Sequence, residues 1–314
     1  MVQPRILIAS LEHQISRVIV GKEDAIQLAL IALICRGHVL IEDVPGVGKT
    51  TLASALARSL NCSFRRIQFT PDLMPSDVTG FTMVNFKTGE MEYREGAIMS
   101  QIVLADEINR TSPRTQSALL EAMEEHQVTV DGTTHYLPQP FMVLATQNPG
   151  EFVGTYPLPE AQMDRFFLRI SMGYPTIEQE MDVLERYSGV QHPMDTITPV
   201  CDASHIVEMQ SMVKGIYCSP EVRSYIATLA AATRREPGLQ LGASTRAAIA
   251  LIHAAQAYAL LSGRDYIIPE DVQNMCLPVV AHRLVLSPEA KMKGVTADQV
   301  LRRILQNVAV PVRV

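Results

Sequence analysis

Residues 38–56, HVLIEDVPGVGKTTLASAL, decide the fold. The apolar run His38–Ile41 predicts a short buried strand, and Thr51–Leu56 predicts a helix. Between them lie Gly46 and Gly48, whose missing Cβ atoms let the backbone approach an anion closely. A strand, a glycine-rich loop and a helix in this order form the context of a phosphate-binding loop, because the N-terminus of the helix attracts negative charge.

The loop departs from the usual GxxxxGKS/T pattern at one position, because Asp43 stands where that pattern has glycine. We expect the backbone amides of Val47–Thr51 to point at phosphate oxygens. Lys49 would contact the β- and γ-phosphates of ATP, and Thr50 would bind Mg²⁺. The alternative is a glycine-rich turn without a ligand, which would need Gly-Lys-Thr to follow an apolar strand by chance. The predicted nucleotide-binding residues of the loop are Pro45, Gly46, Val47, Gly48, Lys49, Thr50 and Thr51.

A second apolar run, Ile102–Ala105, leads directly into Asp106 and Glu107. A buried parallel strand brings such acids to the carboxyl edge of the sheet, where ligands bind in this class of fold. We expect Asp106 to hold Mg²⁺, directly or through water, and Glu107 to polarise the attacking water as a general base. A solvent-exposed acidic pair is the alternative, and the upstream loop favours the catalytic interpretation.

Another apolar run, Phe141–Ala145, is followed by Thr146-Gln147-Asn148-Pro149. In the expected sheet this strand lies beside the strand of the acid pair, so Asn148 would hydrogen-bond the γ-phosphate or the attacking water. The Asn-Pro pair is also an ordinary turn signal. We favour the sensor role for Asn148 because the two strands are expected neighbours.

Short apolar runs separated by helical patterns predict a doubly wound α/β domain whose parallel sheet is buried on both faces. From about residue 189 onward, cap signals at Ser219, Ser244 and Thr296 predict helices only. We therefore predict a nucleotide-binding core over 1–188 and an all-α lid over 189–314. The five predicted strands are His38–Ile41, Phe64–Phe69, Ile102–Ala105, Phe141–Ala145 and Phe166–Ile170.

The composition narrows the class of protein. The 314 residues are 47% apolar, contain no Trp and carry a formal net charge of −6, which argues against a nucleic-acid partner. The five cysteines form no CxxC pair, so we expect neither a disulfide framework nor a zinc site, and a cytoplasmic location. No apolar run resembles a signal peptide or a membrane span, so we expect no membrane insertion.

Two arginines are candidates for catalysis. Arg246 falls in the first turn of the helix that Ser244 is predicted to cap, where a cation opposes the helix dipole by roughly 0.3–1 kcal/mol. An anionic partner would reverse that penalty, and a nucleotide phosphate is one candidate; a solvated arginine is the alternative. Arg165 precedes the last predicted strand and would reach the γ-phosphate of a neighbouring subunit or form a local ion pair with Asp164.

Five motifs, spread over nearly the whole chain, resemble the MoxR family of the AAA+ superfamily. They are residues 19–23 (IVGKE), 40–50 (LIEDVPGVGKT), 106–110 (DEINR), 145–149 (ATQNP) and 242–247 (GASTRA). Aspartate is typical of the first loop position in that family, so Asp43 fits the resemblance. The last motif usually has proline where this chain has Thr245, and both residues suit the first turn of a helix.

The resemblance implies a five-stranded sheet of order 5-1-4-3-2 followed by a helical lid, as in magnesium chelatase ATPase subunits, which share an insert in helix 2. It implies that Ile19, Val20 and Gly21 lie near the adenine. Arg165 would be a finger acting in trans, and Arg246 would be the sensor of the lid. It also implies a homo-oligomeric ring, a hexamer, that remodels or matures a client protein with a von Willebrand factor A-domain partner.

Two hairpins are predicted outside the core strands. Met83–Tyr93 would be the helix-2 insert, with a turn over residues 85–90. Gln127–Val130 and Thr133–Tyr136 flank Asp131-Gly132, a strong two-residue turn signal. We favour a pore-facing element that grips a client for this second hairpin, over an edge hairpin that only covers the core.

Two other functions remain open. A DNA motor related to the helicases needs cations on its hairpins, but residues 127–136 contain no Lys or Arg, and Lys87 is the lone lysine of the insert. A small-molecule kinase would use the same loop. The helical lid, the acid pair and the finger candidate argue against it.

Overall fold

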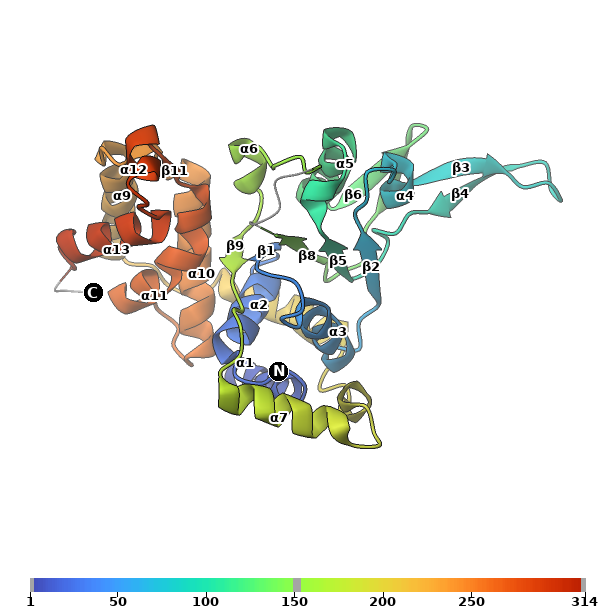
Figure 1. Ribbon diagram of the computed structural model, residues 1–314, viewed down its shortest axis with the longest axis horizontal. Helices are drawn as coiled ribbons and strands as arrows, with labels where there is room; N and C mark the ends of the chain where they lie inside the picture. The colour runs from blue at the N-terminus through green and yellow to red at the C-terminus, as the bar shows by residue number, and fades with distance from the viewer. Residues whose placement is uncertain (1–2, 149–153, 312–314) are drawn as a thin grey trace.

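The computed structural model describes residues 3–148 and 154–311. Its core is a five-stranded parallel sheet of order β2-β5-β8-β1-β9, which confirms the predicted order 5-1-4-3-2 (Figure 1). The predicted strands all form, with ends that shift by one or two residues. They are β1 (Val39–Glu42), β2 (Phe64–Gln68), β5 (Ile102–Asp106), β8 (Met142–Gln147) and β9 (Leu168–Ile170).

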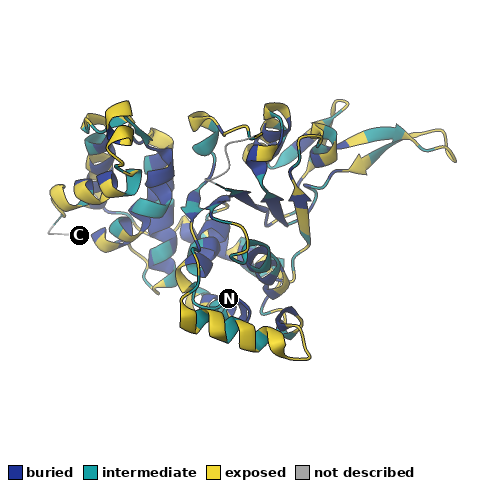
Figure 2. Ribbon diagram, in the orientation of Figure 1, coloured by how far each residue is buried: buried dark blue, intermediate teal, exposed yellow. Residues whose placement is uncertain are grey.

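The sheet separates two apolar cores, because successive side chains of a strand point to opposite faces. Val39 and Ile41 pack with α1 (Pro4–Ser16), α2 (Glu23–Ile34) and α3 (Lys49–Ser59). Leu40 packs on the opposite face with α5 (Pro113–Glu125). The central strands are buried on both faces (Figure 2), as their continuous apolar runs predict.

The buried side chain of His38, which precedes β1, hydrogen-bonds the main chain of β8 and α5. The Nδ1 atom of His38 accepts a hydrogen bond from the amide of Val143 at 3.0 Å, and Nε2 donates to the carbonyl of Met123 at 2.9 Å. Burial lowers the pKa of His38 to about 4. The neutral imidazole therefore belongs to the folded state.

Two hairpins leave the core on the side of β2. The strands β3 (Gly80–Val84) and β4 (Met91–Glu95) form a ribbon that extends away from the body and is longer than the predicted insert (Figure 1). The strands β6 (Gln127–Val130) and β7 (Thr133–Tyr136) pair where the sequence predicts a hairpin, with Asp131 and Gly132 at positive φ. The rings of Tyr93 and His135 stack with their centroids 3.7 Å apart, so the two hairpins are in contact.

Helices dominate the chain after β9. The predicted caps form: Ser219, Ser244 and Thr296 each accept a hydrogen bond from a first-turn amide. A short antiparallel pair, β10 (Leu239–Leu241) with β11 (Val285–Leu286), was not predicted from the sequence. The helices are α7 (Ile177–Ser188), α8 (Ala203–Val213), α9 (Pro220–Arg235), α10 (Thr245–Leu261), α11 (Pro269–Val280), α12 (Pro288–Met292) and α13 (Ala297–Asn307).

The first of the helices after residue 188 lies against the core. Gln210 of α8 donates to the carbonyl of Leu33 in α2 at 2.9 Å, and Arg36 donates to Gln210 at 3.2 Å. Helices α9, α10, α11 and α13 pack with one another, and α10 and α11 also contact α1, α2 and β9 of the core. The domain boundary at residue 188 therefore stays a prediction.

Helix α7 exposes an apolar stripe on its outer side (Figure 2). Its members Ile177, Met181 and Leu184 are 76%, 65% and 65% exposed. Across residues 3–148 and 154–311, no helix is both long enough and apolar enough to cross a membrane.

Candidate active site

The phosphate-binding loop connects β1 to α3, as predicted. Gly46 and Gly48 have φ angles of +86° and +94°, a conformation that favours glycine. A Cβ added at Gly46 would meet no atom within 4 Å, so the space beside this glycine is open. That space is a cavity of about 390 Å³ lined by Pro45, Gly46, Gly48, Lys49, Thr50, Thr51, Arg66, Gln68, Asp106, Glu107 and Asn148.

Lys49 begins α3, and its ammonium group lies among negative charges. Its Nζ atom donates to the main-chain carbonyl of Asp43 at 2.7 Å. Burial lowers the pKa of Lys49, while the nearby carboxylates of Asp43, Asp106 and Glu107 act in the opposite direction. The lysine and the acid pair thus face the same cavity, as a site for nucleotide phosphates and a cation requires.

Asp106 ends β5 and uses both of its carboxylate oxygens. Oδ1 accepts a hydrogen bond from the Thr146 hydroxyl at 2.6 Å, and Oδ2 pairs with the Arg66 guanidinium at 2.6 Å. Asp106 and the Thr50 hydroxyl line the same cavity. The guanidinium of Arg66 pairs with Oδ2 and would compete with a metal for that oxygen. Carboxylate and hydroxyl oxygens are nevertheless ligands that suit Mg²⁺. The residues therefore fit a magnesium ion.

Glu107 follows Asp106 in the left-handed conformation, with φ of +58°. Its Oε2 atom accepts hydrogen bonds from Gln68 at 2.8 Å and from Arg110 at 3.2 Å. These donors hold the carboxylate at the wall of the cavity. Neither Arg66 nor Gln68 was predicted from the sequence to belong to the site. Their alternation on β2, beside β5, was the signal that could have identified them.

The remaining predicted residues of the nucleotide site lie nearby. Asn148 follows β8 and lines the loop cavity; Pro149 lies outside the described residues. Ile19 approaches Gly48, since its Cδ1 lies 3.8 Å from the position of an ideal Cβ there. Val20 and Gly21 continue from Ile19 toward α2, and Val47 packs against the core. The adenine contact of residues 19–21 stays a prediction.

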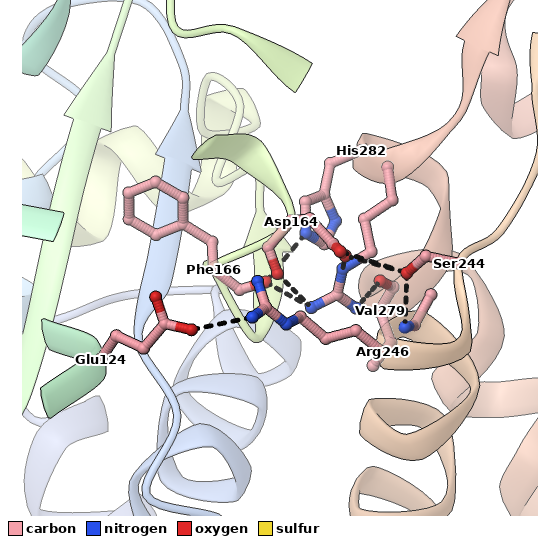
Figure 3. Close-up of polar contacts among 9 residues, drawn as sticks. Glu124, Asp164, Phe166, Ser244, Arg246, Val279 and His282 are labelled. Atoms are coloured by element: carbon pink, nitrogen blue, oxygen red, sulfur yellow. Dashed lines mark hydrogen bonds and ion pairs between the residues drawn. The ribbon is translucent and has the colours of Figure 1, made fainter. Parts of the chain in front are cut away.

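The two candidate arginines converge on one carboxylate, that of Glu124 in the last turn of α5. Arg165 pairs with its Oε2 at 3.1 Å. Arg246 pairs with its Oε1 at 2.8 Å, and Figure 3 shows this second contact. The anion that offsets the helix-dipole penalty at Arg246 is therefore a carboxylate of the core. Arg165 does not pair with the adjacent Asp164, because Asp164 has other partners.

Those partners belong to the lid. Arg283 is buried and pairs with Asp164 at 2.8 Å, and its Nη2 donates to the carbonyl of Phe166 at 2.6 Å. The Ser244 hydroxyl also donates to Asp164, at 3.1 Å (Figure 3). Burial lowers the pKa of Arg283 to about 10, which leaves it charged near neutral pH. These contacts hold the N-terminus of α10, and with it Arg246, against the core.

The arginines and the phosphate-binding loop lie at opposite ends of the parallel strands. The loop follows the C-terminal end of β1, whereas Arg165 precedes the N-terminal end of β9 and Glu124 faces it. Within the described part of the chain, no residue lines both the loop cavity and either of the cavities that Arg165 borders. In one chain, the two arginines and the loop therefore border separate cavities.

Comparison with known proteins shows the family to which the chain belongs. Residues 38–168 match the family described as ATPases associated with various cellular activities (AAA), and residues 231–304 match the AAA lid domain. The uncharacterised protein YeaC of Bacillus subtilis is 54% identical over 97% of this chain and 94% of its own. Chaperone MoxR1 of Mycobacterium tuberculosis is 39% identical over 95% and 81%, and protein MoxR of Methylorubrum extorquens is 31% identical over 96% and 95%.

A solved structure extends the similarity to the arrangement of the whole chain. A Cytophaga hutchinsonii protein, provisionally described as an ATPase, superimposes with a TM-score of 0.91 at 39% identity. The match covers 98% of this chain and 96% of that one.

Proposed function

Because the chain belongs to the MoxR family of AAA+ ATPases, we propose that it hydrolyses ATP with Mg²⁺ as one subunit of a ring. We take the ring to be a hexamer that remodels or matures a client protein in the cytoplasm. The nucleotide would lie between two subunits, one supplying the loop and the acids, the next supplying Arg165 and Arg246.

One observation carries this proposal: both arginines bind Glu124, at the opposite end of the strands from the loop of the same chain. A ring joins the same two unlike surfaces at every interface. It therefore brings the arginine end of one subunit to the loop end of the next. The sequence leaves open whether Arg246 acts in cis or in trans, and this arrangement supports a role in trans for both arginines.

Each residue of the loop end has a task in this reaction. Lys49 and the loop amides would bind the phosphates, and Asn148 would orient the γ-phosphate or the water. Glu107, held by Gln68 and Arg110, would accept a proton from the attacking water. Mg²⁺, held by Thr50 and Asp106, supplies charge neutralisation at the phosphates when it is bound.

The two hairpins are the proposed client-binding elements. The ribbon β3–β4 exposes apolar side chains along its length, including Phe81, Met91 and, at its tip, Phe86, which is 93% exposed. The stacked pair Tyr93 and His135 couples this ribbon to β6–β7, so both would move together. An apolar tip suits a partly unfolded protein better than a DNA backbone. A von Willebrand factor A-domain protein is the proposed partner in delivering that client.

Assembly tests the proposal. With ATP and Mg²⁺, the Glu107→Gln variant should form a ring in light-scattering measurements, because it binds ATP and does not hydrolyse it. Lys49→Ala should stay dissociated, since it lacks the phosphate contact. The wild type should release phosphate without an added acceptor, which a small-molecule kinase would not do. A Glu107→Gln chain that binds ATP and remains monomeric would overturn the ring.

A further inference from the structure

We propose that Asp43 is a positioning residue that ties the phosphate-binding loop to Ser171–Gly173, the segment that leads from β9 into α7. This inference rests on the proposed ATPase function. It concerns the one position at which the loop departs from the usual glycine pattern.

Asp43 is 7% exposed, and its carboxylate accepts hydrogen bonds from four donors. Its Oδ2 atom accepts from the amide of Met172, from the amide of Gly173 at 2.7 Å and from the Ser171 hydroxyl at 3.3 Å. Its Oδ1 atom accepts from the amide of Val44 at 3.0 Å. A buried carboxylate needs such donors, and each charge-assisted hydrogen bond is stronger than a neutral one. A glycine at this position would offer none of these contacts.

The main chain of Asp43 adds the rest of the site. Its carbonyl accepts the hydrogen bond from the Lys49 ammonium at 2.7 Å, and its amide donates to Gln147 at the end of β8 at 3.2 Å. Asp43 thus contacts Lys49, the end of strand β8 and the segment that follows β9. Its side chain is the part of this junction that glycine cannot replace.

The tied segment continues to the other half of the predicted nucleotide site. The carbonyl of Tyr174 accepts a hydrogen bond from Lys22 at 3.2 Å. In α7, Gln179 lies so close to Gly21 that its Nε2 atom would clash with a Cβ placed there. The Cε of Met172 also lies 3.8 Å from an ideal Cβ at Gly48. Asp43 therefore fixes the phosphate loop relative to the residues expected beside the adenine.

The test compares two ligands that differ in the base. Asp43→Gly, which restores the usual loop pattern, should raise the Kd for Mg·ATP by about 10- to 100-fold, because it removes several hydrogen bonds to a charged group. Its Kd for tripolyphosphate, which has no base, should change by less than about threefold, since Lys49 and the loop amides remain. Asp43→Asn should bind ATP nearly as the wild type does, because its carbonyl oxygen can keep the three contacts to Ser171–Gly173. Binding would be measured by competition with a fluorescent ATP analogue.

Two results would overturn the inference. One is Asp43→Gly binding ATP as tightly as the wild type, and the other is an equal loss for ATP and tripolyphosphate. If Asp43→Gly does not fold, as judged by circular dichroism, Ser171→Ala decides. It removes one donor and should weaken ATP binding by a few fold without affecting tripolyphosphate, and no difference overturns the proposal. A wild type that binds no ATP would instead overturn the proposed function.

Discussion

Mixing two inactive variants, Arg165→Ala and Glu107→Gln, should restore ATP hydrolysis. Arg165→Ala alone should slow hydrolysis by roughly 10³-fold or more, as for other arginine fingers. Glu107→Gln alone lacks the general base. In a mixed ring, an Arg165→Ala subunit keeps its loop and Glu107, and a Glu107→Gln neighbour offers it an intact arginine. Each such interface contains one complete site.

The structure sets the size of the rescue. Because the arginine end and the loop end of a chain are separate, a working site needs one particular order of two neighbours. At equal amounts of the variants, about one interface in four has that order in a randomly assembled ring. The steady-state rate should therefore rise to about a quarter of the wild-type rate and fall on either side of the equal mixture.

A matched control separates this effect from simple dilution. Arg303→Ala removes an exposed arginine that pairs with Glu236 at 2.7 Å. Arg303 lines neither the loop cavity nor the cavities that Arg165 borders. Mixed equally with Glu107→Gln, it should give about half the wild-type rate and a straight line against composition, since every interface keeps Arg165. If Arg165 acts in cis, the first mixture shows no maximum at any ratio, although native mass spectrometry detects mixed rings. That result would refute the reasoning.

Three further outcomes follow from described contacts. Arg66→Met should lower the Mg²⁺ concentration at which ATP binding is half-maximal, because the guanidinium of Arg66 competes with the metal for an oxygen of Asp106. A magnesium titration in which that concentration rises would contradict this. Asp271 is 1% exposed and pairs with Arg264 at 2.6 Å. Asp271→Ala should therefore reduce the free energy of unfolding by about 3–5 kcal/mol. Urea unfolding measures this loss, and a loss below about 1 kcal/mol would contradict the prediction. Burial lowers the pKa of His38 to about 4, so the unfolded chain binds a proton at a higher pH than the folded chain does. The free energy of unfolding should therefore be about 2 kcal/mol lower at pH 5 than above pH 6.5. Urea unfolding measured at several pH values tests this, and a free energy that does not change with pH would count against it.

Local signals explain how much of the fold could be predicted. The apolar run around Leu40 and the caps at Ser219 and Ser244 act within a few residues, so their outcomes could be read directly from the sequence. The Asp131-Gly132 turn is local in the same way. The strand order came from resemblance, because pairing between strands far apart in the chain leaves no short-range trace.

The site residues that the sequence did not predict depend on contacts between segments that lie far apart in the chain. Glu124 looks like one more acid of a helix, and it becomes central only because α5, β9 and α10 come together around it. Arg66 reaches Asp106 only because β2 pairs with β5. For Arg246 the sequence indicated that an anion was needed, but it could not tell a phosphate from a carboxylate of the same chain.

The backbone of Glu107 has a consequence for how this protein can change. A residue with a side chain in the left-handed conformation is destabilised by about 1 kcal/mol or more relative to a relaxed one, and glycine avoids that strain. Selection for thermal stability alone would therefore replace Glu107, together with the carboxylate that the reaction is proposed to use. The chain thus keeps a strained backbone conformation at the residue that is proposed to act as the general base. A redesign for higher stability should leave Glu107 unchanged.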